Sequence, residues 1–127
     1  MIIIDSDVLI EILDRKSVKG DQALKQAIES GEETATTVIS LHEVLYGLNK
    51  YGKPVAELLL LPIISFTKKD AVLSSTIERE TEKTGKIIGR TDAMIAAITI
   101  NNGAKLYTFN RKHFDNLQVF GLTLYPK

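Results

Sequence analysis

The chain has 127 residues, of which 44% are hydrophobic and 25% are charged, with 16 Lys and Arg residues balanced by 16 Asp and Glu residues. This length predicts a single domain over residues 1–127, and the composition excludes a disordered or collagen-like chain. The absence of cysteine excludes disulfides, thiolate metal sites and cysteine nucleophiles, and the balanced charge excludes a general electrostatic attraction to nucleic acid.

The first half of the chain alternates short apolar runs with helical patterns. In order, it predicts a strand at residues 1–4, helices at 7–13 and 21–30, a strand at 33–38 and a helix at 40–49 with a buried apolar stripe. The longest apolar run, residues 58–64, is broken by Pro62 and is far below the ~18–20 residues that span a bilayer. Without a secretory signal at its start, the chain is expected to be cytoplasmic and to have no membrane partner.

The second half continues the alternation. It predicts a short helix at 54–61, a strand at 63–66, a long amphipathic helix at 69–84, a buried helix at 91–101, and strands at 105–109 and 122–125, the last at a sheet edge. In the long helix, Ala71, Val72, Ser75 and Ile77 are expected to face the core. This alternation predicts an α/β fold with three layers, α/β/α, and a central, mostly parallel sheet.

Oxygen-bearing side chains follow several of the predicted strands. Asp5 ends the first strand, Glu43 lies on the helix after the second, Asp92 begins the buried helix, and Asn110 follows the strand at 105–109. Each has a local explanation as a helix cap or turn residue, and Ser40 with Glu43 matches a capping box. Ligand sites in parallel sheets lie beyond the carboxyl ends of the strands, so these side chains are expected to converge at one edge.

A cluster of carboxylates requires a compensating charge. Carboxylates within about 4–6 Å raise one another's pKa, and Mg²⁺ or Mn²⁺ relieves that repulsion because these ions prefer carboxylate and amide oxygens. A bound ion can activate water and hold a phosphate oxygen, as phosphodiester hydrolysis requires. The sequence contains no phosphate-binding loop of nucleotide triphosphatases and no evident Ser/His/Asp arrangement.

At these residues the chain resembles PIN-domain ribonucleases, most closely the VapC toxins of type II toxin–antitoxin systems. The resemblance covers almost the whole chain. It rests on four segments in order: Ile3-Ile4-Asp5-Ser6-Asp7-Val8-Leu9-Ile10, Ser40-Leu41-His42-Glu43-Val44-Leu45-Tyr46-Gly47, Asp92-Ala93-Met94-Ile95-Ala96-Ala97, and Thr108-Phe109-Asn110-Arg111-Lys112-His113-Phe114. It implies a PIN fold, Mg²⁺- or Mn²⁺-dependent cleavage of RNA, a homodimer, and inhibition by a small VapB-like antitoxin.

The resemblance also implies roles for individual residues. Asp5, Glu43 and Asp92 correspond to the acidic metal ligands, and Glu43 is expected to orient the attacking water. Many relatives carry a fourth acid near the closing segment, whereas this chain has neutral Asn110 and, just before Phe114, His113. Asn110 is therefore expected to hold a water or the scissile phosphate as a fourth catalytic residue.

Further roles are assigned to residues outside the expected metal site. Arg90 and Arg111 flank the expected site and are interpreted as contacts to RNA phosphates. The apolar residues 58–61 are assigned to the core or a dimer face. Tyr46, Leu48 and Tyr51 are assigned to an antitoxin groove.

Two alternatives stay open at this point. A phosphoacceptor receiver domain shares the size, the parallel α/β plan and an acidic cluster, but it requires an acceptor aspartate after the third strand, where this chain has Thr67, Lys68 and Lys69. A catalytically inactive PIN-like module that binds RNA or protein is compatible with the neutral Asn110.

Overall fold

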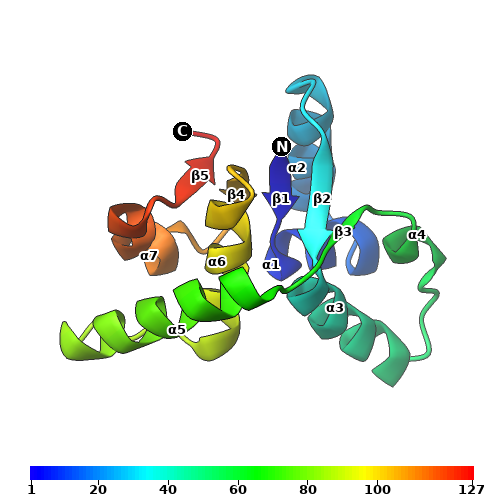
Figure 1. The fold of residues 1–127 in the computed structure, drawn as a ribbon. Coiled ribbons are helices and arrows are strands. Elements are labelled where there is room, and N and C mark those ends of the chain that lie inside the picture. The colour runs from blue at the N-terminus through cyan, green and yellow to red at the C-terminus, as the bar shows by residue number, and fades with distance from the viewer.

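Five parallel strands form the centre of the protein in the computed structural model, which describes residues 1–127 (Figure 1). Their order is β3-β2-β1-β4-β5, and every neighbouring pair is parallel. The predicted α/β fold and the edge position of the last strand are thus confirmed. The strands are β1 (Ile2–Ile4), β2 (Thr34–Thr37), β3 (Ile63–Ile64), β4 (Lys105–Tyr107) and β5 (Thr123–Tyr125).

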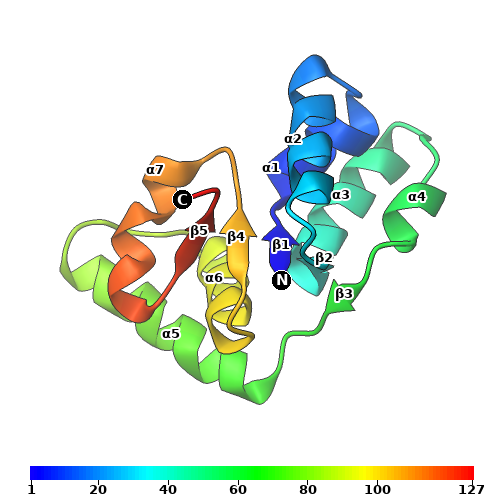
Figure 2. The same ribbon diagram turned by 90° about the horizontal axis from the view of Figure 1, so that it is seen from above.

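Helices connect the strands and cover the sheet. Figure 2 shows α2, α3 and α4 grouped beside β2 and β3, with α5, α6 and α7 grouped beside β4 and β5. None of the helices is long and apolar enough to cross a membrane. The helices are α1 (Ser6–Leu9), the π-helix η1 (Ile10–Asp14), α2 (Val18–Glu29), α3 (Val38–Lys50), α4 (Ala56–Leu59), α5 (Lys68–Lys83), α6 (Arg90–Asn101), α7 (Arg111–Phe114) and the 3₁₀ helix η2 (Asp115–Phe120).

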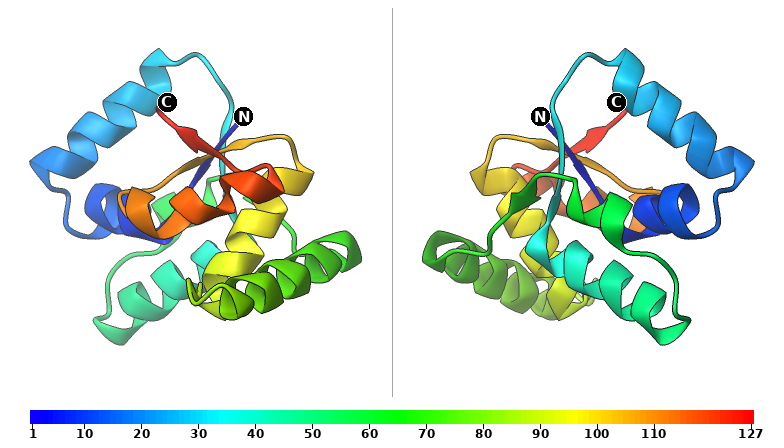
Figure 3. Two further views of the ribbon diagram at one scale, coloured as in Figure 1. Left: turned by 90° about the vertical axis from the view of Figure 1, so that its left-hand side faces the viewer. Right: turned by 90° about the vertical axis from the view of Figure 1, so that its right-hand side faces the viewer.

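Two hydrophobic cores lie on the two faces of the sheet because strand side chains alternate in direction. Ile2 and Ile4 belong to the core that contains residues of α1, α2, α3 and α4, whereas Ile3 belongs to the core formed with α5, α6 and α7. Figure 3 shows α2 and α5 on opposite sides of the strands. The three-layer arrangement predicted from the sequence is confirmed.

The long helix α5 differs from the prediction in the face that it buries. Val72 is 62% exposed and Ser75 is also exposed, so their assignment to the core is wrong. The buried stripe is instead mostly polar and consists of Asp70, Ser74, Ile77 and Thr81. Hydroxyl groups on a helix can bond to the preceding turn, as Thr81 Oγ1 does to Ile77 O over 2.9 Å, and a hydrophobicity pattern does not detect such a stripe.

Candidate functional site

The carboxyl ends of β1 and β4 lie side by side at the centre of the sheet. The register pairs Ile4 with Tyr107, and the amide of Asp5 donates to Tyr107 O over 2.9 Å. The connection after β1 leads to β2 on one side of it, whereas β4, which follows α6, lies on the other side of β1. The carboxyl ends of β1 and β4 therefore mark the topological switch point, which is where open α/β sheets bind ligands.

Asp5 occupies that point and is almost completely buried, with 5% of its surface exposed. Its Oδ1 accepts a hydrogen bond from Ser6 N over 2.8 Å and caps α1. Its Oδ2 accepts from the hydroxyl of Thr108 over 2.8 Å. The Asp5 carboxylate therefore both caps α1 and belongs to the candidate site.

Thr108 and Asp7 anchor the loop that follows β4. The Thr108 hydroxyl accepts a hydrogen bond from Asn110 N over 3.1 Å, while Asp7 Oδ2 accepts from Phe109 N over 3.1 Å. The second oxygen of Asp7, Oδ1, is buried without a hydrogen-bond partner. The sequence assigns no role to Thr108. The one feature that indicates its importance is its place two residues before Asn110 in the last of the four segments.

Glu43 is joined to Asp5 through the hydroxyl of Ser6. Ser6 Oγ lies 3.2 Å from Glu43 Oε1 and 3.4 Å from Asp5 Oδ1. The alternative interpretation of Glu43 as part of a capping box with Ser40 is wrong, because α3 begins at Val38 and Thr37 is its N-cap. Glu43 therefore lies in the second turn of α3, where its carboxylate bonds to Ser6 instead of to the backbone of the N-cap.

Asp92 and Asn110 are held differently from Asp5. Asp92 lies in the first turn of α6, and its Oδ2 is 2.8 Å from His113 Nε2. Asn110 is exposed and is the N-cap residue of α7, but its side chain makes no capping hydrogen bond. The structure thus joins Asp5 and Glu43 through one hydroxyl, pairs Asp92 with His113, and leaves the Asn110 amide group directed to no protein partner.

Burial and mutual repulsion raise the pKa values of these acids. Burial, with the charge of Asp7 as a second cause, raises the pKa of Asp5 to about 7. Burial and the negative charge of Asp92 raise the pKa of Glu43, although its hydrogen bond from Ser6 opposes the shift. Burial also raises the pKa of Asp7. Neither Asp5, Asp7, Glu43 nor Asp92 forms an ion pair with a lysine or arginine.

The donor set fits a hard divalent cation in its chemistry. The groups are carboxylate oxygens, no lysine or arginine pairs with them, and one buried oxygen of Asp7 lacks a hydrogen-bond partner. No three Asp, Glu or His side chains are gathered closely enough to form a complete cation cage. Because like charges repel, we expect such carboxylates to remain apart until a cation is bound.

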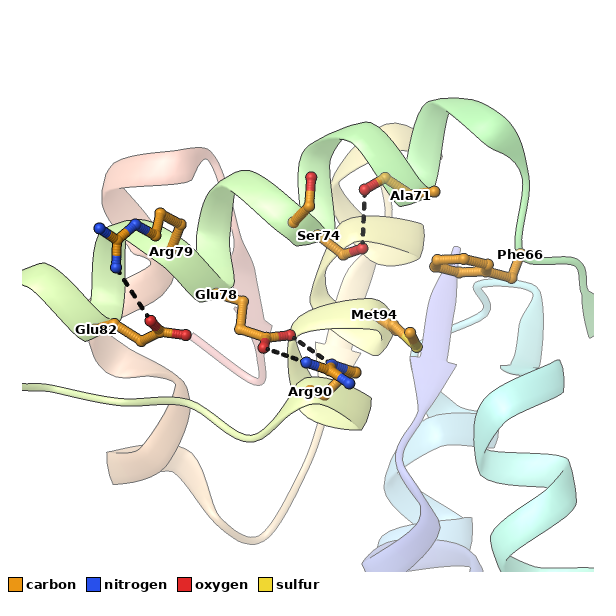
Figure 4. Close-up of a pocket in the computed structure, with 9 residues that line it drawn as sticks. Phe66, Ala71, Ser74, Glu78, Arg79, Glu82, Arg90 and Met94 are labelled. Carbon is orange, nitrogen blue, oxygen red and sulfur yellow. Dashed lines mark hydrogen bonds and ion pairs between the residues drawn. The ribbon is translucent and has the colours of Figure 1, made fainter.

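The two arginines interpreted as phosphate contacts differ in their surroundings. The guanidinium of Arg90 is bonded twice to Glu78 of α5, from Nε to Oε1 and from Nη2 to Oε2, each over 3.1 Å. Figure 4 shows this pair in a pocket between α5 and α6 that Phe66 and Met94 also line. Arg111 forms no ion pair and is partly exposed at the start of α7.

The receiver alternative does not agree with the topology. It requires an acceptor aspartate at the end of the third strand, but β3 lies at the edge of the sheet and is followed by Ser65, Phe66 and Thr67. The acids at the switch point come instead from the ends of β1 and from the helices α3 and α6.

Comparison with known proteins supports one family. The chain is similar to Ribonuclease VapC1 of Methanocaldococcus jannaschii, with 29% identity over 129 residues that cover 99% of this chain and 88% of that protein. Its fold is similar to VapBC2 from Rickettsia felis bound to a promoter DNA fragment (TM-score 0.81, 26% identity, 98% of this chain and 97% of that chain). It is also similar to DNA-bound VapBC from Salmonella typhimurium (TM-score 0.78, 20% identity, 97% and 95%). The PIN domain family model matches residues 2–119, and the chain therefore belongs to the PIN domain family.

Proposed function

We propose that this protein is a divalent-metal-dependent endoribonuclease that hydrolyses RNA phosphodiester bonds and serves as the toxin of a type II toxin–antitoxin pair. The observation that carries the proposal is the acidic edge at the end of β1, formed by Asp5, Glu43 and Asp92, with which no lysine or arginine pairs. Asp5 and Glu43 share the Ser6 hydroxyl, and the negative charge of Asp92 raises the pKa of both. The similarity to a protein named as a ribonuclease supports RNA as the substrate.

Asp5, Glu43 and Asp92 would hold Mg²⁺ or Mn²⁺ in this proposal. When bound, the ion would lower the pKa of the attacking water and stabilise negative charge on the phosphoryl oxygens. Thr108 and Ser6 N fix the orientation of the Asp5 carboxylate through its two oxygens. These bonds keep Asp5 in place against the repulsion of its acidic neighbours.

Glu43 and Asn110 provide the remaining polar groups. Glu43 is partly open to solvent, so its carboxylate can accept a proton of the attacking water and orient it toward phosphorus. The exposed Asn110 amide, which has no capping role, can donate to a phosphate oxygen. Arg111, without an ion-pair partner, can position the RNA backbone, whereas Arg90 would first have to leave Glu78.

RNA cleavage with and without metal tests this function. We expect the purified protein to cut structured RNA in Mn²⁺, to lose that activity in chelator, and to lose it again in the Asp92→Asn variant. Because the attacking group is water rather than the 2′-hydroxyl, RNA with a 2′-deoxy sugar at the cleaved position should still be cut. The length of the labelled fragments on a denaturing gel gives the measurement.

The same assay separates the proposal from the inactive binding module. Cleavage that survives chelator, or that is equal in the wild type and the Asp92→Asn variant, would point to a contaminating nuclease and contradict the assignment. Binding of RNA without any cleavage in Mg²⁺ or Mn²⁺ would favour the PIN-like module that lacks catalysis.

An apolar groove offers a surface for the antitoxin. It has a volume of about 440 Å³ and lies between η1, α2 and the α4 segment, with Leu60 84% and Ile28 68% exposed. Its apolar lining comprises Ile4, Leu9, Ile12, Leu13, Leu24, Ala27, Ile28, Leu60 and Leu61. We propose that an amphipathic helix of a small VapB-like antitoxin binds here, because the structurally similar proteins are solved as complexes with antitoxins.

This groove differs from the one interpreted from the sequence. The assignment of Leu48 is contradicted by its burial, with 2% of its surface exposed, whereas Tyr46 and Tyr51 are exposed but do not line the groove.

The chain is further proposed to form a homodimer, as the resemblance implies. Sedimentation equilibrium of the purified protein tests this oligomeric state.

A charged residue in the groove is expected to prevent antitoxin binding. Leu60→Glu should weaken the complex about tenfold or more, because a buried apolar contact would be replaced by a desolvated carboxylate. Val119→Glu is the matched control, since Val119 is equally exposed at 84% but lies on η2, outside the groove. Calorimetric titration of each variant with a purified VapB-like antitoxin measures the affinity, and equal affinity of both variants would argue against this groove.

A further inference from the structure

His113 is the one side chain that hydrogen-bonds to Asp92. The distance from His113 Nε2 to Asp92 Oδ2 is 2.8 Å, and a carboxylate can only accept, so Nε2 carries the donated hydrogen. The other oxygen of Asp92, Oδ1, accepts no hydrogen bond from the protein. The N-cap residue of α6 is Gly89, so no capping side chain lies beside Asp92 to restrain it.

The imidazole of His113 is itself held by packing. The next residue, Phe114, is 1% exposed in the core, and the two rings meet edge to face with centroids 5.4 Å apart at 82°. The amide of His113 donates to Asn110 O over 3.1 Å in the first turn of α7. The donor is therefore fixed to a rigid part of the fold rather than to a free loop end.

Asp92 requires such a restraint because its neighbours repel it. The charge of Asp92 acts on both Asp5 and Glu43, and in each case it disfavours the ionised form. A carboxylate with 31% of its side chain exposed could lower this repulsion by rotating into solvent. The bond from Nε2 opposes that rotation and leaves Oδ1 without a hydrogen bond.

We propose that His113 is a positioning residue that holds the Asp92 carboxylate at the acidic edge by donating from Nε2. The inference rests on the proposed function, because it assigns Asp92 to cation binding. Carboxylates that bind metals are themselves hydrogen-bonded, and losing such a partner costs about 10–100-fold in metal affinity or activity. His113 acts here through Asp92 and need not touch the substrate.

The variants His113→Gln and His113→Asn test whether the position of the hydrogen-bond donor matters, because both replace the imidazole by an amide. The amide nitrogen of glutamine reaches the place of histidine Nε2, whereas that of asparagine reaches only the place of Nδ1. In His113→Asn we expect Mn²⁺ affinity to fall about 10–100-fold, and in His113→Gln to remain close to that of the wild type. Isothermal titration with Mn²⁺ measures the affinity, and thermal unfolding in chelator checks that both variants keep the wild-type midpoint.

Kinetics and a double variant complete the test. At saturating Mn²⁺, His113→Asn should recover most of its kcat with an unchanged KM for RNA, because the defect lies in holding the cation. In the Asp92→Asn background the substitution His113→Asn should have no further effect on Mn²⁺ affinity, since the group that it positions is absent.

Each contrary result has a separate meaning. Equal Mn²⁺ affinity of the wild type and both His113 variants would overturn the positioning role, provided that Asp5→Asn still loses binding. Equal losses in His113→Gln and His113→Asn would show that the imidazole acts in another way and would also overturn it. A wild type that binds no Mn²⁺ and cuts no RNA would instead contradict the proposed function, and this inference with it.

Discussion

Replacement of Asp5 by asparagine is expected to abolish metal-dependent RNA cleavage and to stabilise the metal-free protein above pH 7. Asparagine keeps the shape of the side chain: its oxygen can accept from Ser6 N, and its amide can donate to the Thr108 hydroxyl. It removes the negative charge at the centre of the acidic edge. The loss of several kcal/mol of metal-supplied stabilisation corresponds to about a thousandfold or more in rate.

The gain in stability follows from the pKa of Asp5, which burial raises from its ordinary value of 3.8 to about 7 in the folded protein. The folded state keeps its proton where the unfolded state has lost it. The contribution of Asp5 to the free energy of unfolding is therefore fully present below about pH 4, falls as the pH rises toward 7, and is lost above pH 7, a change of about 4 kcal/mol. The raised pKa values of Asp7 and Glu43 add a dependence of the same sign.

Urea unfolding in chelator at pH 5 and pH 8 tests the stability prediction. The wild type should be more stable at pH 5, and Asp5→Asn should show a smaller difference between the two pH values. Added Mn²⁺ should stabilise the wild type at pH 8 and should not stabilise the variant, because ligand binding to the folded state alone raises stability. A wild type that becomes more stable from pH 5 to pH 8 without metal would contradict the prediction.

Gly20→Ala is expected to destabilise the protein, because Gly20 of α2 packs directly on the backbone of η1. A Cβ atom at this position would lie 2.2 Å from Glu11 O and 2.8 Å from Ile12 N, and backbone atoms cannot rotate out of its way. The helix α2 would have to move away from η1. Such overpacking costs about 1–3 kcal/mol, and the same movement would distort the apolar groove between these two elements.

Gly47→Ala in α3 is the matched control for Gly20→Ala. A Cβ atom at Gly47 would meet no atom within 4 Å, so only the intrinsic helix preference changes. This favours alanine over glycine by about 1 kcal/mol within a helix. Urea unfolding should therefore show the two identical substitutions shifting stability in opposite directions. Equal stability of Gly20→Ala and the wild type would show that the contact between α2 and η1 is not tightly packed.

Much of the fold was predictable because its signals are local. The run Ile2–Ile4, the helical pattern of residues 69–84 and the apolar stretch of α6 are local patterns, and each produced the expected type of element. The predictions lost accuracy where polar residues are buried, as with Asp70 and Ser74 of α5. The short helices α7 and η2 were not predicted, since they depend on the burial of Phe114 and Leu117 against distant strands and helices.

The candidate site was predictable in its acids but not in their partners. Asp5 and Glu43 were identifiable because they follow β1 and β2, whose carboxyl ends share one edge of the parallel sheet. Asp92 was identifiable because it begins the buried helix within a segment that resembles the family. The roles of Ser6 and Thr108 were not, and Asn110 is exposed rather than part of the hydrogen-bonded acid network. Whether the three acids bind metal remains a prediction that the Mn²⁺ titrations test.

The sequence by itself determined the order of strands and helices and the residue types at each strand exit, since these depend on neighbours within one or two turns. Only the tertiary structure decided which of those residues meet. Thr108 lies 103 positions from Asp5, and their contact depends on the register that pairs Ile4 with Tyr107. The bond between His113 and Asp92 likewise depends on how α7 packs beside α6. Such pairings are set by the packing of the whole core, to which no single segment of sequence gives access.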